Sequence, residues 1–117
     1  PPLRLSSAAS DVYKRQPKLL VLDEPFAALD AFTREELWCV LRDLWIDHKF
    51  TTLLVTHDLR EAAFLADKIF VMSARPGKIT NVHNVNFKHK RDLKITYSEK
   101  FVKLTQNLRK EISNNRS

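Results

Sequence analysis

Two carboxylates and one imidazole stand at the ends of apolar segments in this chain. Asp23 and Glu24 follow four consecutive aliphatic residues, and His57 follows a second run rich in aliphatic residues. Carboxylates can bind a divalent cation or activate a water molecule, and a histidine can donate a hydrogen bond or exchange a proton. These residue types together predict a site for a metal ion and a reacting water molecule. The plain alternative is that the acids are solvated turn residues and the histidine is a surface or capping residue.

The segments that carry these residues are predicted to form a strand, a helix and a strand. Residues 19–22 are an unbroken apolar run closed by a proline, which is typical of a strand buried on both faces of a parallel sheet. Residues 51–56 predict a second buried strand, and a helix is expected over about 31–47, capped by Asp30 or Thr33. The apolar face of this helix is expected to consist of Leu37, Val40, Leu41, Leu44 and Trp45.

This order of elements predicts that the three polar residues share one edge of a sheet. A strand, a helix and a strand in succession form a βαβ unit, whose two strands run parallel. Parallel neighbours end at the same edge, so His57 is expected at the same rim as Asp23 and Glu24. In open α/β sheets, ligands bind outside that edge.

The second half of the chain predicts a hairpin and a helix. Residues 68–73 read as a third strand, followed by a tight turn at 75–77 and an extended segment to about Phe87. Thr96 and Glu99 have the spacing of a capping box at the start of a C-terminal helix. Apolar residues recur on that helix at the spacing of a packing stripe: Phe101, Leu104, Leu108 and Ile112.

Composition limits the chemistry that the chain can carry by itself. A chain of 117 residues is one domain at most, and its single glycine, Gly77, excludes the glycine-rich loops that cradle phosphates. Its single cysteine, Cys39, excludes an internal disulfide and is expected to be a buried, inert thiol in a reduced compartment.

The net charge of +6 comes from the last part of the chain. Residues 1–85 hold as many acidic as basic side chains, whereas residues 86–117 hold nine basic and three acidic ones. A basic tail can bind nucleic acid or an anionic membrane, or it can be the solvated outer face of a packed helix. The apolar stripe favours the solvated outer face.

Taken together, the motifs resemble those of the ATPase subunits of ATP-binding-cassette (ABC) transporters. The run LLVLDEP at 19–25 is similar to their Walker B strand, ALD at 28–30 to their D-loop, and VTHD at 55–58 to their switch-histidine strand. The run SARPGKI at 73–79 further resembles the branch that energises uptake of nitrate, sulfonates, taurine and related small anions. The resemblance covers about residues 17–112.

The resemblance implies a fold and a role for each site residue. The fold would be α/β, a partial P-loop NTPase (ABC ATPase) core with parallel strands, a short C-terminal hairpin and a C-terminal helix. Asp23 would hold Mg²⁺ through a water molecule, and Glu24 would orient and deprotonate the water that attacks the γ-phosphate of ATP. His57 would donate a hydrogen bond to that phosphate. Asp30 would reach across a dimer interface towards the partner's nucleotide.

The resemblance also implies partners and a location. An ABC importer ATPase works as a homodimer on a membrane permease subunit, together with a solute-binding protein, at the cytoplasmic face of the cell membrane as a peripheral protein. Nucleic acid is not expected as a partner. Two alternatives stay open: an ABC-type ATPase that acts on nucleic acid, favoured by the basic tail, and a non-catalytic fragment or regulatory module.

The beginning of the chain departs from the family pattern. Residues 1–16 show no regular period, and 6–16 look like translated adapter sequence, so the family domain is expected to span 17–117. Neither the P-loop nor the glycine-rich signature of the family is present, which predicts that about the N-terminal half of the natural protein is missing. Residues 1–117 alone are therefore expected to bind ATP weakly or not at all, and not to hydrolyse it.

Overall fold

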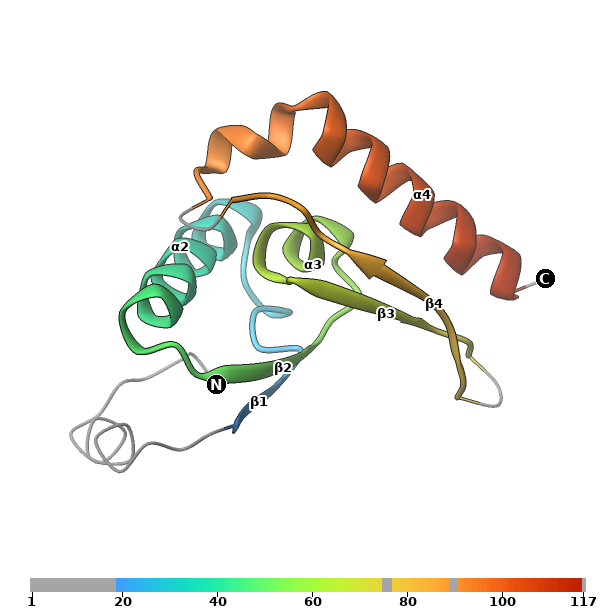
Figure 1. Cartoon of the computed structure of the whole chain (residues 1–117), viewed down its shortest axis with the longest axis horizontal. Coiled ribbons are helices and arrows are strands. Elements are labelled where there is room, and N and C mark those ends of the chain that lie inside the picture. Colours follow the sequence, from blue (N-terminus) through green and yellow to red (C-terminus); the bar gives the residue numbers. More distant parts are fainter. Residues whose placement is uncertain (1–18, 75–76, 89–90, 117) are drawn as a thin grey trace. The chain divides into compact units, whose positions relative to one another are not determined.

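The computed structural model describes residues 19–74, 77–88 and 91–116 of the chain. It is a mixed α/β structure that divides into two compact units, Pro1–His57 and Asp58–Ser117, called unit one and unit two below. The predicted α/β class is confirmed. In chain order the elements are β1 (Leu19–Asp23), α2 (Ala31–His48), β2 (Thr51–Val55), α3 (Leu59–Leu65), β3 (Lys68–Met72), β4 (Ile79–Asn84), the 3₁₀ helix η1 (Leu93–Tyr97) and α4 (Glu99–Arg116) (Figure 1).

The sheet of unit one is a parallel pair, as the βαβ order predicts. β1 and β2 pair in register from Leu19 opposite Thr51 to Asp23 opposite Val55. Their carboxyl ends therefore lie side by side. This pairing sets the position of the candidate site.

The prediction that both strands are buried on both faces is wrong for the described structure. Leu19, Val21, Leu53 and Val55 are 46–56% exposed, and they alternate along each strand with half-buried residues. Successive side chains of a strand point to opposite faces of the sheet, so this alternation means that one face is covered and the other is open. The unbroken apolar runs suit strands that are covered on both faces, but the described residues cover only one face.

Helix α2 begins and ends close to the predicted residues. Asp30 rather than Thr33 caps it, because Asp30 Oδ2 accepts the Thr33 N–H at 3.2 Å. Trp38 and Leu41 are buried, whereas Val40, predicted on the apolar face, is 46% exposed. At 3.6 residues per turn, Val40 lies on the side of the helix opposite Trp38. Among the described residues of unit one, the buried apolar ones are Phe26, Trp38, Leu41 and Phe50, and Cys39 is half-buried rather than buried.

Unit two contains the predicted hairpin. β3 and β4 pair antiparallel, and the pairing continues past the strands through the Ser73 N–H, which donates to the Lys78 carbonyl at 2.8 Å. Residues 75 and 76 of the predicted turn lie outside the described residues. Figure 1 shows helix α4 running beside the hairpin. Between them lies an apolar cluster built on Ile69, Val71, Val85 and Leu108, against which Leu104 and Ile112 also pack.

Helix α4 confirms the predicted apolar stripe but not the predicted cap. Phe101 and Leu108 are each only 1% exposed. The capping box of Thr96 and Glu99 is wrong, because Thr96 lies inside η1 and its hydroxyl donates to the Leu93 carbonyl at 2.7 Å. Ser98 takes the capping role instead: its Oγ accepts the Phe101 N–H at 3.2 Å.

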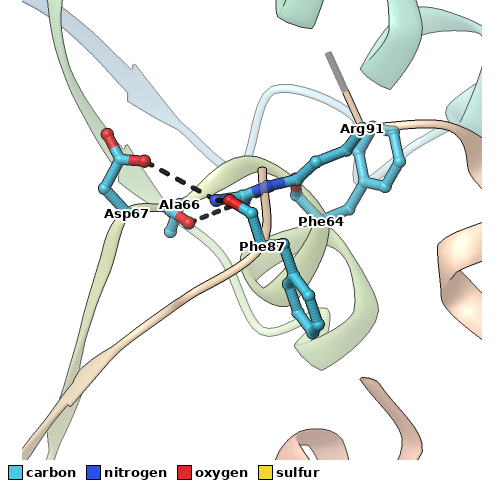
Figure 2. Close-up of polar contacts among 5 residues, drawn as sticks. All are labelled: Phe64, Ala66, Asp67, Phe87 and Arg91. Atoms are coloured by element: carbon cyan, nitrogen blue, oxygen red, sulfur yellow. Dashed lines mark hydrogen bonds and ion pairs between the residues drawn. The ribbon is translucent and has the colours of Figure 1, made fainter. Parts of the chain in front are cut away.

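One basic residue of the tail is buried. Figure 2 shows the Arg91 guanidinium among backbone carbonyls, where it donates to Phe64 O at 2.9 Å, Ala66 O at 2.8 Å and Phe87 O at 3.2 Å. Asp67 lies 3.6 Å from the same group. Two of these carbonyls belong to the last turn and the cap of α3, where helical carbonyls have no partner within the helix. The expectation that the basic tail is a solvated face is therefore wrong for Arg91.

Candidate functional site

The end of β1 presents two acidic residues in different settings. Asp23 is the last residue of the strand and is exposed. Glu24 leaves the strand with a φ of 48°, in the left-handed region that non-glycine residues rarely adopt, and its N–H donates to Val55 O at 2.7 Å. The parallel pairing therefore continues one residue past β1. It ties the backbone of Glu24 to the segment that carries His57.

The side chains of Glu24 and His57 contact each other. His57 Nδ1 lies within hydrogen-bonding distance of Glu24 Oε1, across 33 positions of sequence. The Glu24 side chain is 29% exposed and the His57 side chain 86% exposed. The structure thus brings together two of the three residues that the strand topology predicts at this rim. No contact of the Asp23 side chain with either residue is seen in the described part of the chain.

This contact restricts what each group can do. An ionised carboxylate only accepts hydrogen bonds, so the ring donates to it when Nδ1 carries the proton. The other ring nitrogen, Nε2, then remains for a different ligand, and it donates only when the imidazole is doubly protonated. A carboxylate held on one side by His57 can orient and deprotonate a water molecule on the other side.

The segment between β1 and α2 is organised by short-range hydrogen bonds. The Ala27 N–H donates to Glu24 O at 3.3 Å and the Leu29 N–H to Phe26 O at 3.1 Å, so two turns follow each other. The Phe26 ring anchors the segment, since the residue is only 1% exposed. The segment therefore leads from Glu24 to Asp30 along a defined path.

Asp30 lies at the end of this segment and is exposed. Hydrogen bonds from the side chain and then the backbone of Thr33 lower the pKa of Asp30, because they stabilise its charged form. One oxygen, Oδ2, takes part in the cap of α2. The described residues show no contact of Asp30 with Glu24 or His57, so Asp30 is not part of that pair.

Sequence reasoning missed Arg34, the fourth residue of α2. Its Nη2 donates to the Leu29 carbonyl at 2.8 Å, which ties the first turn of the helix to the segment before Asp30. One signal was present in the sequence. A cation in the first turn of a helix is unfavourably placed in the field of the helix dipole, so an arginine there calls for a specific partner.

The described part of the site offers few side chains that could bind a metal ion. Within the described residues, no group of three or more His, Cys, Asp or Glu side chains could hold a metal ion by itself. Asp23 offers a single exposed carboxylate. This fits Mg²⁺, which keeps several water molecules and uses one or two carboxylates together with substrate phosphates. No helix among the described residues is long and apolar enough to cross a membrane.

Comparison with known proteins gives relatives but no family model: none matches the chain. The aliphatic sulfonates import ATP-binding protein SsuB of Bacillus licheniformis is 54% identical over 65 residues, which make up 56% of this chain and 26% of that protein. The SsuB of Bacillus cereus is 51% identical over 77 residues, 66% of this chain and 31% of that protein. SsuB 1 of Xanthomonas axonopodis is 46% identical over 78 residues, 67% of this chain and 31% of that protein.

The chain therefore spans less than a third of the length of these relatives. Their names agree on import and on ATP binding. The parallel βαβ unit, the hairpin and the C-terminal helix are compatible with part of such a protein. The resemblance read from the motifs is thus confirmed: over the part that it spans, the chain is similar to the ATP-binding subunits of ABC importers of aliphatic sulfonates.

Proposed function

We propose that this chain carries the hydrolytic residues of an ATP-binding subunit that drives an ABC importer. The observation that carries the proposal is the contact between Glu24 and His57 at the adjoining ends of two parallel strands. A carboxylate and an imidazole held together at that edge suit an attack by water on a phosphoryl group, where catalysis consists of positioning and charge stabilisation.

Each residue has a role in this proposal. Glu24 orients and deprotonates the attacking water. His57, when doubly protonated, donates to the Glu24 carboxylate through Nδ1 and to the γ-phosphate of ATP through Nε2. Asp23 is the residue that would hold Mg²⁺ through a water molecule. When bound, Mg²⁺ neutralises charge on the phosphate oxygens. Asp30 belongs to the interface with a second copy of the subunit.

The exposure of the pair supports the need for a partner surface. The His57 side chain is 86% exposed, whereas charge stabilisation is strong only where water is excluded. We infer that a second copy of the ATP-binding subunit covers this rim when ATP is bound. The homodimer would act on a permease subunit at the cytoplasmic face of the membrane, supplied by a solute-binding protein. The names of the relatives point to sulfonates among the small anions.

The chain alone is expected to be inactive. Loops that cradle phosphates need glycines, and the single glycine of the chain, Gly77, is four residues after Ser73 in the hairpin connection. Glu24 and His57 can position a water molecule, but residues 1–117 include no glycine-rich loop to hold the triphosphate. We therefore propose that residues 1–117 bind ATP weakly and do not hydrolyse it, which titration with a fluorescent ATP analogue and a phosphate-release assay test.

The proposal is tested in a hybrid in which residues 17–117 replace the corresponding part of the Bacillus licheniformis relative. We expect Mg²⁺-dependent ATP hydrolysis that falls at least about a hundredfold in Glu24→Gln, because the water loses its base. ATP binding should be kept. The matched control is Glu36→Gln on α2, an exposed glutamate that we expect to leave turnover unchanged. If Glu24→Gln and Glu36→Gln hydrolyse ATP equally well, Glu24 is not the base.

A further inference from the structure

We propose that Arg34 is a positioning residue of the nucleotide site, which it serves by clamping the main chain that joins Glu24 to Asp30. The inference rests on the proposed function above and extends it to a residue that touches neither water nor nucleotide. It starts from the contact of Arg34 Nη2 with the Leu29 carbonyl at 2.8 Å.

The clamp acts where the segment has least support of its own. The two turns at Glu24–Ala27 and Phe26–Leu29 fix the first part, and the buried ring of Phe26 anchors it. The Leu29 carbonyl comes after these turns. Arg34 supplies its donor from the next element, through a part-buried hydrogen bond from a charged group. Such bonds are stronger than those between neutral groups.

Arg34 also contacts the segment through its backbone. Its N–H donates to Asp30 O at 2.9 Å, the first bond of the helical ladder. Asp30 itself caps the helix through Thr33. Residues 29 and 30 are therefore held from α2 by one side-chain donor and two backbone donors. Earlier in the segment, Glu24 O accepts the Ala27 N–H and Phe26 O accepts the Leu29 N–H.

The position of Arg34 in the helix supports a specific role. A cation in the first turn opposes the helix dipole, and α2 carries no acidic residue within that turn, although its cap residue is Asp30. Departures from local sequence rules are expected at functional or strained sites. Here the guanidinium reaches back towards the segment, and it stabilises the path from Glu24 to Asp30.

The first test uses the 117-residue chain and needs no activity. Amide hydrogen exchange followed by NMR reports the Leu29 and Thr33 N–H groups, which depend on the shape of the segment. In Arg34→Ala we expect both to exchange about tenfold faster, the effect of one charge-assisted hydrogen bond. The control is Arg42→Ala on the same helix, whose guanidinium contacts Asp43 and should leave both amides unchanged. Equal exchange in the two variants would overturn the clamp.

The second test asks whether the clamp serves the reaction. In the hybrid described above, the single-turnover rate constant of bound ATP does not depend on how much of the protein is folded. We expect it to fall at least about tenfold in Arg34→Ala, because small misplacements of reacting groups are costly. Arg34→Lys keeps one charged donor and should recover part of the rate. If Arg34→Ala does not fold, the rate of Arg34→Lys relative to the parent tests the role instead.

The two tests separate the possible failures. A hybrid that depends on Glu24 but not on Arg34 overturns the positioning role and leaves the proposed function standing. A hybrid that is indifferent to Glu24→Gln overturns the proposed function, and with it the role of Arg34 in the reaction. Faster exchange in Arg34→Ala, a slower single turnover and partial recovery in Arg34→Lys together establish the inference.

Discussion

Replacing Arg91 by methionine should destabilise unit two far more than the loss of a surface charge would. The Arg91 side chain is 3% exposed, and its guanidinium donates to the carbonyls of Phe64, Ala66 and Phe87 at 2.8–3.2 Å. Burial lowers the pKa of Arg91 and the charge of Asp67 opposes that shift, but an arginine stays charged at neutral pH. Methionine fills a similar volume, so the change removes the donors without opening a large cavity.

The magnitude follows from the three lost hydrogen bonds. Bonds from a charged group contribute about 1.5 kcal/mol or more each, and the change leaves three carbonyls without this donor. We expect a loss of about 3–5 kcal/mol in the free energy of unfolding of unit two. Asp67→Asn should cost less than about 1 kcal/mol, because the Asp67 side chain is 58% exposed and its ion pair is weak.

The assay must report unit two. Both tryptophans, Trp38 and Trp45, belong to unit one, so their fluorescence is not suitable. Native-state amide exchange at the Ala66 and Val102 N–H groups, which bond within α3 and at the start of α4, is suitable. The control is Lys94→Met, an exposed lysine in the same segment. A difference below about 1 kcal/mol between Arg91→Met and Lys94→Met would refute the reasoning, because it would mean that water solvates the guanidinium and the carbonyls.

Three further predictions concern the elements around the site. Ser98→Ala should lower the free energy of opening of α4, measured by amide exchange, by about 1 kcal/mol, because it removes the cap. A change near zero would contradict that role. Asp30 has a lowered pKa, so the stability that its cap gives α2 is fully present above about pH 4 and is lost as the pH falls through the lowered value. Far-UV circular dichroism should show this loss of helix at acid pH in the parent but not in Asp30→Asn. Identical curves for the two proteins would exclude the cap. Leu108→Ala should cost about 2–5 kcal/mol on urea unfolding of unit two, since the side chain is 1% exposed; a cost below this range would mean that the apolar cluster is not packed as described.

The local elements could be predicted because their signals lie within single segments. The parallel pairing of 19–23 with 51–55 follows from two apolar runs separated by a helix, and the apolar stripe from Phe101 to Ile112 from a period of 3.6. The predictions that were wrong concerned burial, which depends on the neighbouring elements. An apolar run does not say how many of its faces are covered, and Val21 and Leu53 prove to be exposed.

Caps and buried charges were also beyond prediction from the sequence. Thr96 and Ser98 both stand near the start of α4, and only the path of η1 decides that Ser98 is the cap. Arg91 stands among lysines in a basic tail, and its burial depends on the carbonyls of α3, 25 and 27 positions earlier. No pattern within the tail reports such a distant partner.

The candidate site, like the fold, could be predicted only in part from the sequence. The topology places His57 beside Glu24, and the structure shows their side chains in contact. The left-handed backbone of Glu24 and the reach of Arg34 to Leu29 depend on three-dimensional detail that spacing does not carry. The chemical roles of Glu24, His57, Asp23 and Asp30 remain proposals that kinetic measurements test.

The central claim is that Glu24 and His57 act as one unit in ATP hydrolysis. A double-mutant cycle in the hybrid tests it directly, with Glu24→Gln, His57→Ala and the double variant compared by their single-turnover rate constants. Residues that act as a unit are strongly non-additive, so we predict that the double variant is about as slow as the slower single variant. Rate losses that multiply in the double variant would show that the two residues act independently, and would contradict the account.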